Sequence, residues 1–224
     1  MDPIAGPTCG MCGESLPVIA GNSAQQLCSV CQEEPPAYEK AVTYGAYDGG
    51  LRELIHLLKY EQVIPAAGVL GSMLAKAIRK LSLQCAIVII PVPLHRSKKR
   101  QRGFNQSELI LRTALKKLPS LDATLAANVL ERSQATVSQI GLTRPQRKEN
   151  LRGAFRVVHP SRVRGANVLL VDDVFTTGTT ISECARVLRR AGAEHVWVAT
   201  VARTLRNHAA SLHIEESSAV GMDV

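Results

Sequence analysis

Residues 167–180, with the sequence NVLLVDDVFTTGTT, constrain the fold of this chain more than any other stretch. The apolar run 168–171 predicts a strand buried on both faces, because a covered parallel strand needs no polar alternation. Asp172 and Asp173 close that strand, a turn rich in Thr and Gly follows, and a helical pattern then begins near Ile181. Strand, acidic pair, small-residue loop and helix start therefore form one unit.

This unit predicts a pocket for a phosphorylated sugar. Backbone N–H groups at a helix N-terminus, together with threonine hydroxyls, suit a phosphate group. The adjacent carboxylates suit ribose hydroxyls or a bound Mg²⁺ ion. The simpler alternative is an aspartate that caps an ordinary helix, but a cap needs one Asp and no Thr-rich loop. The phosphate-binding residues expected here are Thr176, Thr177, Gly178, Thr179 and Thr180.

Two other nucleotide-binding patterns are missing from the sequence. A P-loop needs Gly-x-x-x-x-Gly-Lys-Ser/Thr, and a dinucleotide site needs Gly-x-Gly-x-x-Gly after an early strand. Neither run occurs in the 224 residues.

Composition sets broad limits on the protein. A chain of 224 residues with 46% hydrophobic content can bury one sizeable core and carry a small appendage. Its 27 basic and 19 acidic residues give a net charge of +8, which favours phosphate, pyrophosphate or nucleic acid without distinguishing among them. No apolar run is long enough for a membrane-spanning helix, and residues 1–7 do not resemble a signal peptide. We therefore expect a cytoplasmic protein.

Four of the six cysteines have the spacing C-x₂-C-x₁₅-C-x₂-C, which is typical of a zinc site. Four sulfur ligands fill a tetrahedral ion, so the zinc would be structural. A redox pair is the alternative, but no strand–helix unit lies beside these motifs. Cys85 and Cys184 are expected to be inert core residues. The expected zinc ligands are Cys9, Cys12, Cys28 and Cys31.

Strands that alternate with helices predict an α/β fold with a doubly wound, mostly parallel sheet. We expect a zinc-binding module over 1–36, an α/β domain over 37–206 and a polar tail over 207–224. The patterns predict strands at 41–47, 86–90, 124–130, 155–158, 168–174 and 195–201, and helices at 51–60, 66–81, 105–117 and 180–191.

A first basic loop is expected directly after the strand at 86–90. Ligands of open α/β sheets lie beyond the carboxyl ends of the strands, so this loop would hold pyrophosphate while 176–180 holds the sugar phosphate. Contact with nucleic acid and a merely solvated run are the alternatives. Its cationic residues are Arg96, Lys98, Lys99, Arg100 and Arg102.

A second polar, cationic stretch covers 132–150 and is expected to be a long loop. Such a loop could fold over a bound polyanion and exclude water. Arg144 and Arg147 are the candidates to close over that charge. By composition alone, an ordinary exposed loop is an equally good interpretation.

The run 168–180 also resembles the phosphoribosyl pyrophosphate (PRPP) signature of the type I phosphoribosyltransferases. The resemblance implies that Asp172 and Asp173 hold the 2- and 3-hydroxyls of ribose and that Thr176–Thr180 wrap the 5-phosphate. Purine-salvage members carry an Asp at the position of Thr176. Proton transfer to a purine ring from this loop is therefore not expected.

Further motifs resemble the ComF family, whose members are phosphoribosyltransferase-like proteins linked to natural competence and DNA uptake. The resemblance covers residues 9 to about 203, including the cysteines, PVPL at 91–94 and RQRGFNQ at 100–106. It implies PRPP with Mg²⁺ as ligand. It also implies single-stranded DNA and competence-machinery proteins, such as a DNA-uptake helicase, as partners.

Three functions fit these motifs: a phosphoribosyltransferase, a non-catalytic DNA-processing accessory, and a regulator that senses PRPP or a nucleotide. No residue in the sequence is a clear base for activating an acceptor. The sequence therefore predicts phosphoribosyl binding first and leaves transfer open.

Overall fold

The computed structural model describes residues 4, 6–17, 26–133 and 144–205. Its centre is a five-stranded sheet in which every neighbouring pair is parallel. The strands follow the order β1 (Lys40–Ala46), β7 (His195–Arg203), β6 (Asn167–Phe175), β2 (Ile87–Pro91) and β3 (Ala123–Leu125).

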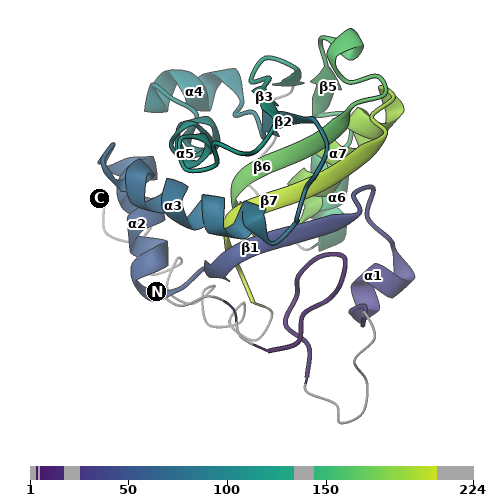
Figure 1. Cartoon of the computed structure of the whole chain (residues 1–224), viewed down its shortest axis with the longest axis horizontal. Helices are drawn as coiled ribbons and strands as arrows, with labels where there is room; N and C mark the ends of the chain where they lie inside the picture. The colour runs from purple at the N-terminus through teal and green to yellow at the C-terminus, as the bar shows by residue number, and fades with distance from the viewer. Residues whose placement is uncertain (1–3, 5, 18–25, 134–143, 206–224) are drawn as a thin grey trace.

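Helices cover both faces of this sheet, as Figure 1 shows. One face packs against α2 (Gly49–Tyr60), α3 (Ala66–Arg79) and α5 (Gln106–Leu115). The other packs against α7 (Thr179–Arg190) and the cysteine-bearing segment, which includes the short α1 (Ser29–Glu33). The doubly wound parallel sheet predicted from the sequence is confirmed.

Strand β6 is central because both of its faces are buried. Val168 and Leu170 belong to the core on the α7 side, whereas Leu169 and Val171 belong to the core on the α3 side. All four side chains are fully buried. The run 168–171 is therefore apolar throughout because both faces of the strand are buried, as the sequence predicted.

A small antiparallel hairpin lies beside the main sheet. It pairs β4 (Leu130–Arg132) with β5 (Phe155–Val157). The single strand expected over 124–130 was wrong, because β3 ends at Leu125 and the chain turns through Ala126 before β4 begins in the other sheet.

Two segments that were expected to be loops contain helices. Residues Arg96–Arg102 form α4, which His95 caps by accepting the Ser97 N–H and which Gly103 ends with a φ of 82°. Arg, Lys and Gln are good helix formers, and cations in the last turn suit the helix dipole. Residues Arg144–Leu151 form α6, which the fully buried Leu151 anchors to the core. Neither helix has a wide apolar face in sequence, which is why hydrophobic periodicity missed both.

Cys184 is buried, as expected, but Cys85 is exposed and the expectation of a core position for it was wrong. Cys85 precedes β2 in the loop after α3, where the strand has not yet entered the core. Across the described residues, none of the helices combines the length and apolar character needed to cross a bilayer.

Candidate functional site: an acidic pair beside a phosphate-type loop

The acidic pair lies near the carboxyl end of β6, with Asp173 buried and Asp172 half-buried. One Asp172 oxygen, Oδ1, accepts hydrogen bonds from the Ser107 hydroxyl at 2.8 Å and from the Asp173 N–H at 2.9 Å. Both acids therefore meet the first turn of α5, which covers the end of the strand.

The position of α5 follows from its local sequence. Asn105 caps the helix by accepting the Ser107 N–H at 3.0 Å, and its amide donates to the Val92 carbonyl at 2.9 Å. This second bond fixes the helix start just beyond the end of β2. The positive end of the helix dipole consequently faces the two carboxyl groups.

Asp173 is held from two sides. Lys59, near the end of α2, forms an ion pair with its Oδ2, and Gln106 donates to its Oδ1 at 3.3 Å. The side chains of Lys59 and Asp173 are 17% and 5% exposed, so the pair is largely shielded from water. Burial alone would raise the pKa of Asp173, but the Lys59 charge and these hydrogen bonds outweigh it and lower the pKa. Asp173 is therefore ionised.

The pKa of Asp172 moves in the opposite direction. Burial and, after it, the negative charge of Asp173 raise the pKa of Asp172 to about 8, despite the hydrogen bond from Ser107. At neutral pH the pair thus carries one negative charge and one proton, the arrangement expected of two adjacent carboxyl groups. A cation bound next to Asp172 would release that proton.

The loop between β6 and α7 has the features of an anion site. Gly178 adopts a φ of 76° and, as the N-cap residue, has no side chain with which to cap the helix. The hydroxyls of Thr177 and Thr179 lie 2.8 Å apart, and Thr176 and Thr177 are exposed. Thr179 and Thr180 are the first two residues of α7. Backbone N–H groups and hydroxyls are therefore gathered where the helix dipole is positive.

Gly178 is required by packing as well as by its backbone angle. A Cβ atom at this position would lie 2.5 Å from Cζ of Phe175, far inside contact distance. The loop therefore rests directly on the Phe175 ring.

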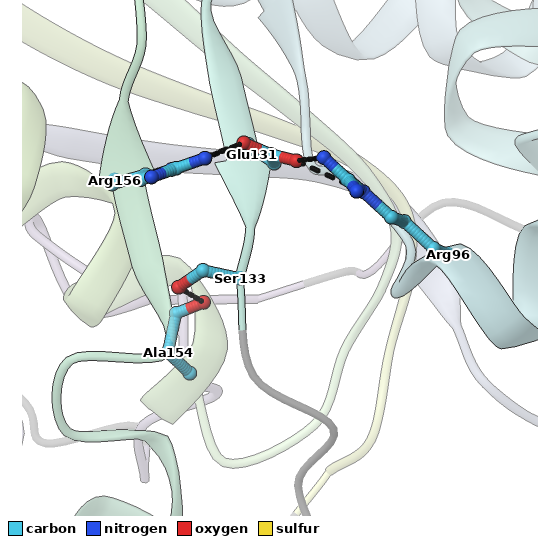
Figure 2. A network of polar contacts seen from close by, with 5 residues as sticks. All are labelled: Arg96, Glu131, Ser133, Ala154 and Arg156. Atoms are coloured by element: carbon cyan, nitrogen blue, oxygen red, sulfur yellow. Dashed lines mark hydrogen bonds and ion pairs between the residues drawn. The ribbon is translucent and has the colours of Figure 1, made fainter.

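The five cations of α4 do not act as one group. Arg96 donates to Glu131 on β4, with an Nε to Oε1 distance of 3.1 Å, and Arg156 on β5 binds the other oxygen of Glu131. Figure 2 shows Glu131 between the two guanidinium groups, with the Ser133 to Ala154 hydrogen bond nearby. Arg96 therefore ties α4 to the hairpin.

Lys98 and Arg102 belong to the same positive region as Lys59. Burial, followed by the charges of Arg132, Arg102 and Lys59, lowers the pKa of Lys98. Arg102 donates to Gln106 at 2.5 Å, and Gln106 in turn contacts Asp173. Lys99 and Arg100 are exposed. The structure thus connects Arg102 to the acidic pair through Gln106, whereas Lys98, like Lys99 and Arg100, is exposed on α4.

Arg144 and Arg147 lie in α6, but their side chains are outside the described part of the structure, as are residues 134–143. Their role as candidates for covering a bound anion stays a prediction.

The four predicted zinc ligands come together. Their sulfur atoms all lie within 4.8 Å of one another, and all four residues are buried. Cys12 Sγ and Cys28 Sγ are 3.7 Å apart. A tetrahedral zinc ion with Zn–S bonds of about 2.3 Å needs sulfur atoms about 3.8 Å apart, so this cluster fits the ion.

Sequence analysis did not identify Lys59, Gln106 and Ser107 as partners of the acids. Each lies in a helix, far along the chain from β6. The one local signal was Asn105, whose type favours a helix cap and hence predicts that the next two residues begin a helix.

The parallel sheet, with an acidic pair and a Thr-rich loop at the end of β6, is the arrangement expected of a phosphoribosyltransferase-type domain. Comparison with known proteins supports this class. Residues 110–220 match the family model described as "Phosphoribosyl transferase domain". The match begins within α5, so it includes β6 and its loop but not Lys59.

Relatives identify the family. Competence protein F of Haemophilus influenzae is 33% identical over 88% of this chain and 85% of its own length. DNA utilization protein YhgH of Shigella flexneri is 34% identical over 88% of this chain and 84% of its own length. The chain belongs to the ComF family of competence proteins. Among solved structures, the allosteric regulatory enzyme of purine biosynthesis is 24% identical over 62% of this chain and 26% of that chain, with a TM-score of 0.38.

Proposed function

We propose that the protein binds PRPP, or a related phosphorylated ribose, together with Mg²⁺. The observation that carries this proposal is that two different types of group adjoin each other in one strand–loop–helix unit. A half-neutralised acidic pair lies near the end of β6, and the strand leads into a Gly-centred, Thr-rich loop at the N-terminus of α7. The first group suits ribose hydroxyls and the second suits a phosphate.

In this proposal Thr176–Thr180 hold the 5-phosphate and Asp172 holds ribose hydroxyls. Asp173 would not bind the ligand directly, because Lys59 and Gln106 already occupy the carboxylate oxygens of Asp173. Its negative charge would act by raising the pKa of Asp172. Lys98 and Arg102 supply positive charge for the pyrophosphate. Mg²⁺ would be held between ligand oxygens and Asp172, where it neutralises phosphate charge.

Ribosyl transfer is a further step of the same proposal. Such a reaction passes through a cationic sugar, so the protein would act mainly by positioning and by stabilising the departing pyrophosphate. Lys98, Arg102 and the predicted Arg144 and Arg147 are the groups for that role. The described residues that interact with Asp172 are Asp173, Ser107, Lys59, Arg132 and Cys184. None of them is a ready base for an acceptor, because Lys59 and Gln106 occupy Asp173 and burial raises the pKa of the Cys184 thiol. We therefore propose binding as the primary function.

Calorimetric titration with Mg²⁺ and PRPP tests the proposal. Wild type should bind, Asp172→Asn should bind at least several-fold more weakly, and Asp122→Asn on the exposed loop before β3 should bind like wild type. Ribose 5-phosphate and inorganic pyrophosphate, titrated separately, report on the two halves of the site. The absence of PRPP binding to folded wild-type protein would refute the proposal.

The relatives named for competence and DNA utilization favour a second function, and so does the exposed basic surface of α4. In this alternative the protein is a DNA-processing accessory that binds single-stranded DNA through residues such as Lys99 and Arg100. The affinity for a single-stranded oligonucleotide should then fall steeply as salt increases. Lys99→Gln/Arg100→Gln should make that dependence shallower, and a flat dependence in wild type would exclude this role.

A further inference from the structure

Arg203, the last residue of β7, connects the cysteine cluster to the phosphate-type loop. Its side chain is only 4% exposed. The guanidinium donates to the backbone carbonyl of Cys12 and to Glu14 Oε2, the latter at 2.6 Å. It also lies 3.8 Å from Cys12 Sγ. One face of the cysteine cluster is thus fixed to the end of a central strand.

The same guanidinium also contacts Phe175, the last residue of β6, which precedes the loop at 176–180. Its carbon lies 4.4 Å from the centre of the Phe175 ring, within the distance of a cation–π contact. Phe175 is itself buried, and its backbone carbonyl accepts the Thr204 N–H at 3.0 Å. The ring is therefore held between the end of β7 and the loop above it.

Gly178 completes the connection, because it packs so closely on the Phe175 ring that an added Cβ would force the ring to shift. The position of the Phe175 ring therefore bears directly on the position of the loop. Elsewhere the cysteine segment and the loop are separated by a cavity of about 460 Å³, with Cys31 and Tyr38 on one side and Thr177 and Thr179 on the other. Arg203 and Phe175 also line this cavity.

We infer that Arg203 is a positioning residue, which transmits the geometry of the metal-loaded cysteine cluster through Phe175 to the Gly178 loop. An intact cluster fixes the Cys12 carbonyl, and that carbonyl and Glu14 fix Arg203. Arg203 in turn fixes the Phe175 ring, on which the Gly178 loop packs. Loss of the metal frees Cys12 and loosens the loop. The effect on ligand affinity rests on the proposed function, whereas the effect on the loop itself does not.

Hydrogen exchange tests the inference without any ligand. In zinc-loaded wild type, the amides of 182–184 should be protected, because the Ser182 N–H donates to the Gly178 carbonyl at 2.8 Å and begins the hydrogen-bonded part of α7. Stripping the metal with a chelator should accelerate their exchange roughly tenfold, an ordinary magnitude for coupled sites. Amides of β2, on the far side of β6 from β7, serve as the internal reference. Acceleration that is absent, or that spreads equally to β2, would overturn the inference.

Two variants keep the test independent of metal removal. Phe175→Leu and Arg203→Lys should retain one zinc per chain yet show fast exchange at 182–184, with little further change on chelation. Arg189→Lys is the matched control, since Arg189 also binds backbone carbonyls, at the end of α7 away from the loop, and it should behave like wild type. Slow exchange in both variants would contradict the inference.

A calorimetric arm with Mg²⁺ and PRPP separates the inference from the proposed function. Chelation should weaken PRPP binding in wild type by the same roughly tenfold factor as the exchange. Loaded wild type that binds no PRPP refutes the proposed function, while the exchange result still decides the role of Arg203.

Discussion

Lys59 on α2 forms an ion pair with Asp173 on β6, in a position where both side chains are largely withdrawn from water. The pair fixes the end of α2 to the edge of the sheet where the candidate site lies. It also decides how the two acids divide their charge, because Lys59 keeps Asp173 ionised and the ionised Asp173 keeps a proton on Asp172.

Removal of Lys59 should destabilise the protein. Lys59→Met leaves the buried Asp173 carboxylate without its counter-charge, and removing one partner of a buried pair costs about 3–5 kcal/mol. We expect a smaller loss in Lys59→Met/Asp173→Asn, because neither charge then remains. Urea unfolding measures both, with Lys116→Met on the exposed surface as control. A single variant as stable as wild type would show that the pair does not hold the site together.

The stability of the fold should depend on pH through Asp172. The folded state raises its pKa from 3.8 to about 8, so between these values the folded state holds a proton that the unfolded chain has lost. This contribution is fully present below pH 3.8 and disappears as pH rises through about 8. Asp172→Asn should therefore remove part of the decline in unfolding free energy between pH 5 and about 8.5. If the unfolding free energies of wild type and Asp172→Asn changed with pH in parallel, the raised pKa of Asp172 would be excluded.

Ligand binding should release a proton if Asp172 meets Mg²⁺. A carboxyl group with a pKa of about 8 must ionise to bind a cation, so calorimetry near pH 7 should give heats that depend on the ionisation enthalpy of the buffer. The dependence should vanish in Asp172→Asn. Buffer-independent heats for wild type would mean that Asp172 does not contact the cation.

Gly178→Ala should damage the loop more than an ordinary glycine substitution. The new Cβ meets Phe175 at a strained, positive φ, and such changes cost about 1–3 kcal/mol. Thermal unfolding measures the loss, and PRPP titration measures the effect on the site. Gly68→Ala in α3 is the matched control, because its Cβ has open space and a helix interior gains about 0.5–1 kcal/mol from the change.

Metal analysis should find one zinc per chain in reduced protein. Cys9→Ser/Cys12→Ser should lose the metal and lower the unfolding temperature, because the cluster shares its hydrophobic core with α7 and the sheet. Cys85→Ser should retain the metal, since Cys85 is exposed and lies outside the cluster. Zinc-free wild type with normal stability would rule out a structural ion.

Local sequence patterns predicted those parts of the molecule whose determining residues lie close together in the chain. β6 was identifiable because both of its faces are buried, and the cysteine cluster because its ligands lie in two short knuckles. The helix α4 was missed because caps at His95 and Gly103, and not an apolar stripe, define it.

The electrostatics of the site depend on contacts that no local pattern contains. In the sequence Lys59 is simply one of the two Lys and Arg residues of an amphipathic helix, and only the packing of α2 against the sheet brings it to Asp173. Arg203 lies beyond the strand predicted at 195–201, yet in the structure it ends β7 and is buried against Glu14. The acids and the loop could therefore be named from sequence, but their unequal charge states could not.

The bonds from Arg203 to Cys12 and Glu14 also have a consequence for synthesis of the chain. Cys12 leaves the ribosome early, but its partner follows 191 residues later. At ordinary translation rates that interval is roughly 10–40 s. During this time the first two cysteines lack the strand end that fixes them in the finished protein. The cysteine segment can therefore reach its final position only after β7 has been made, although it is synthesised before every strand of the sheet.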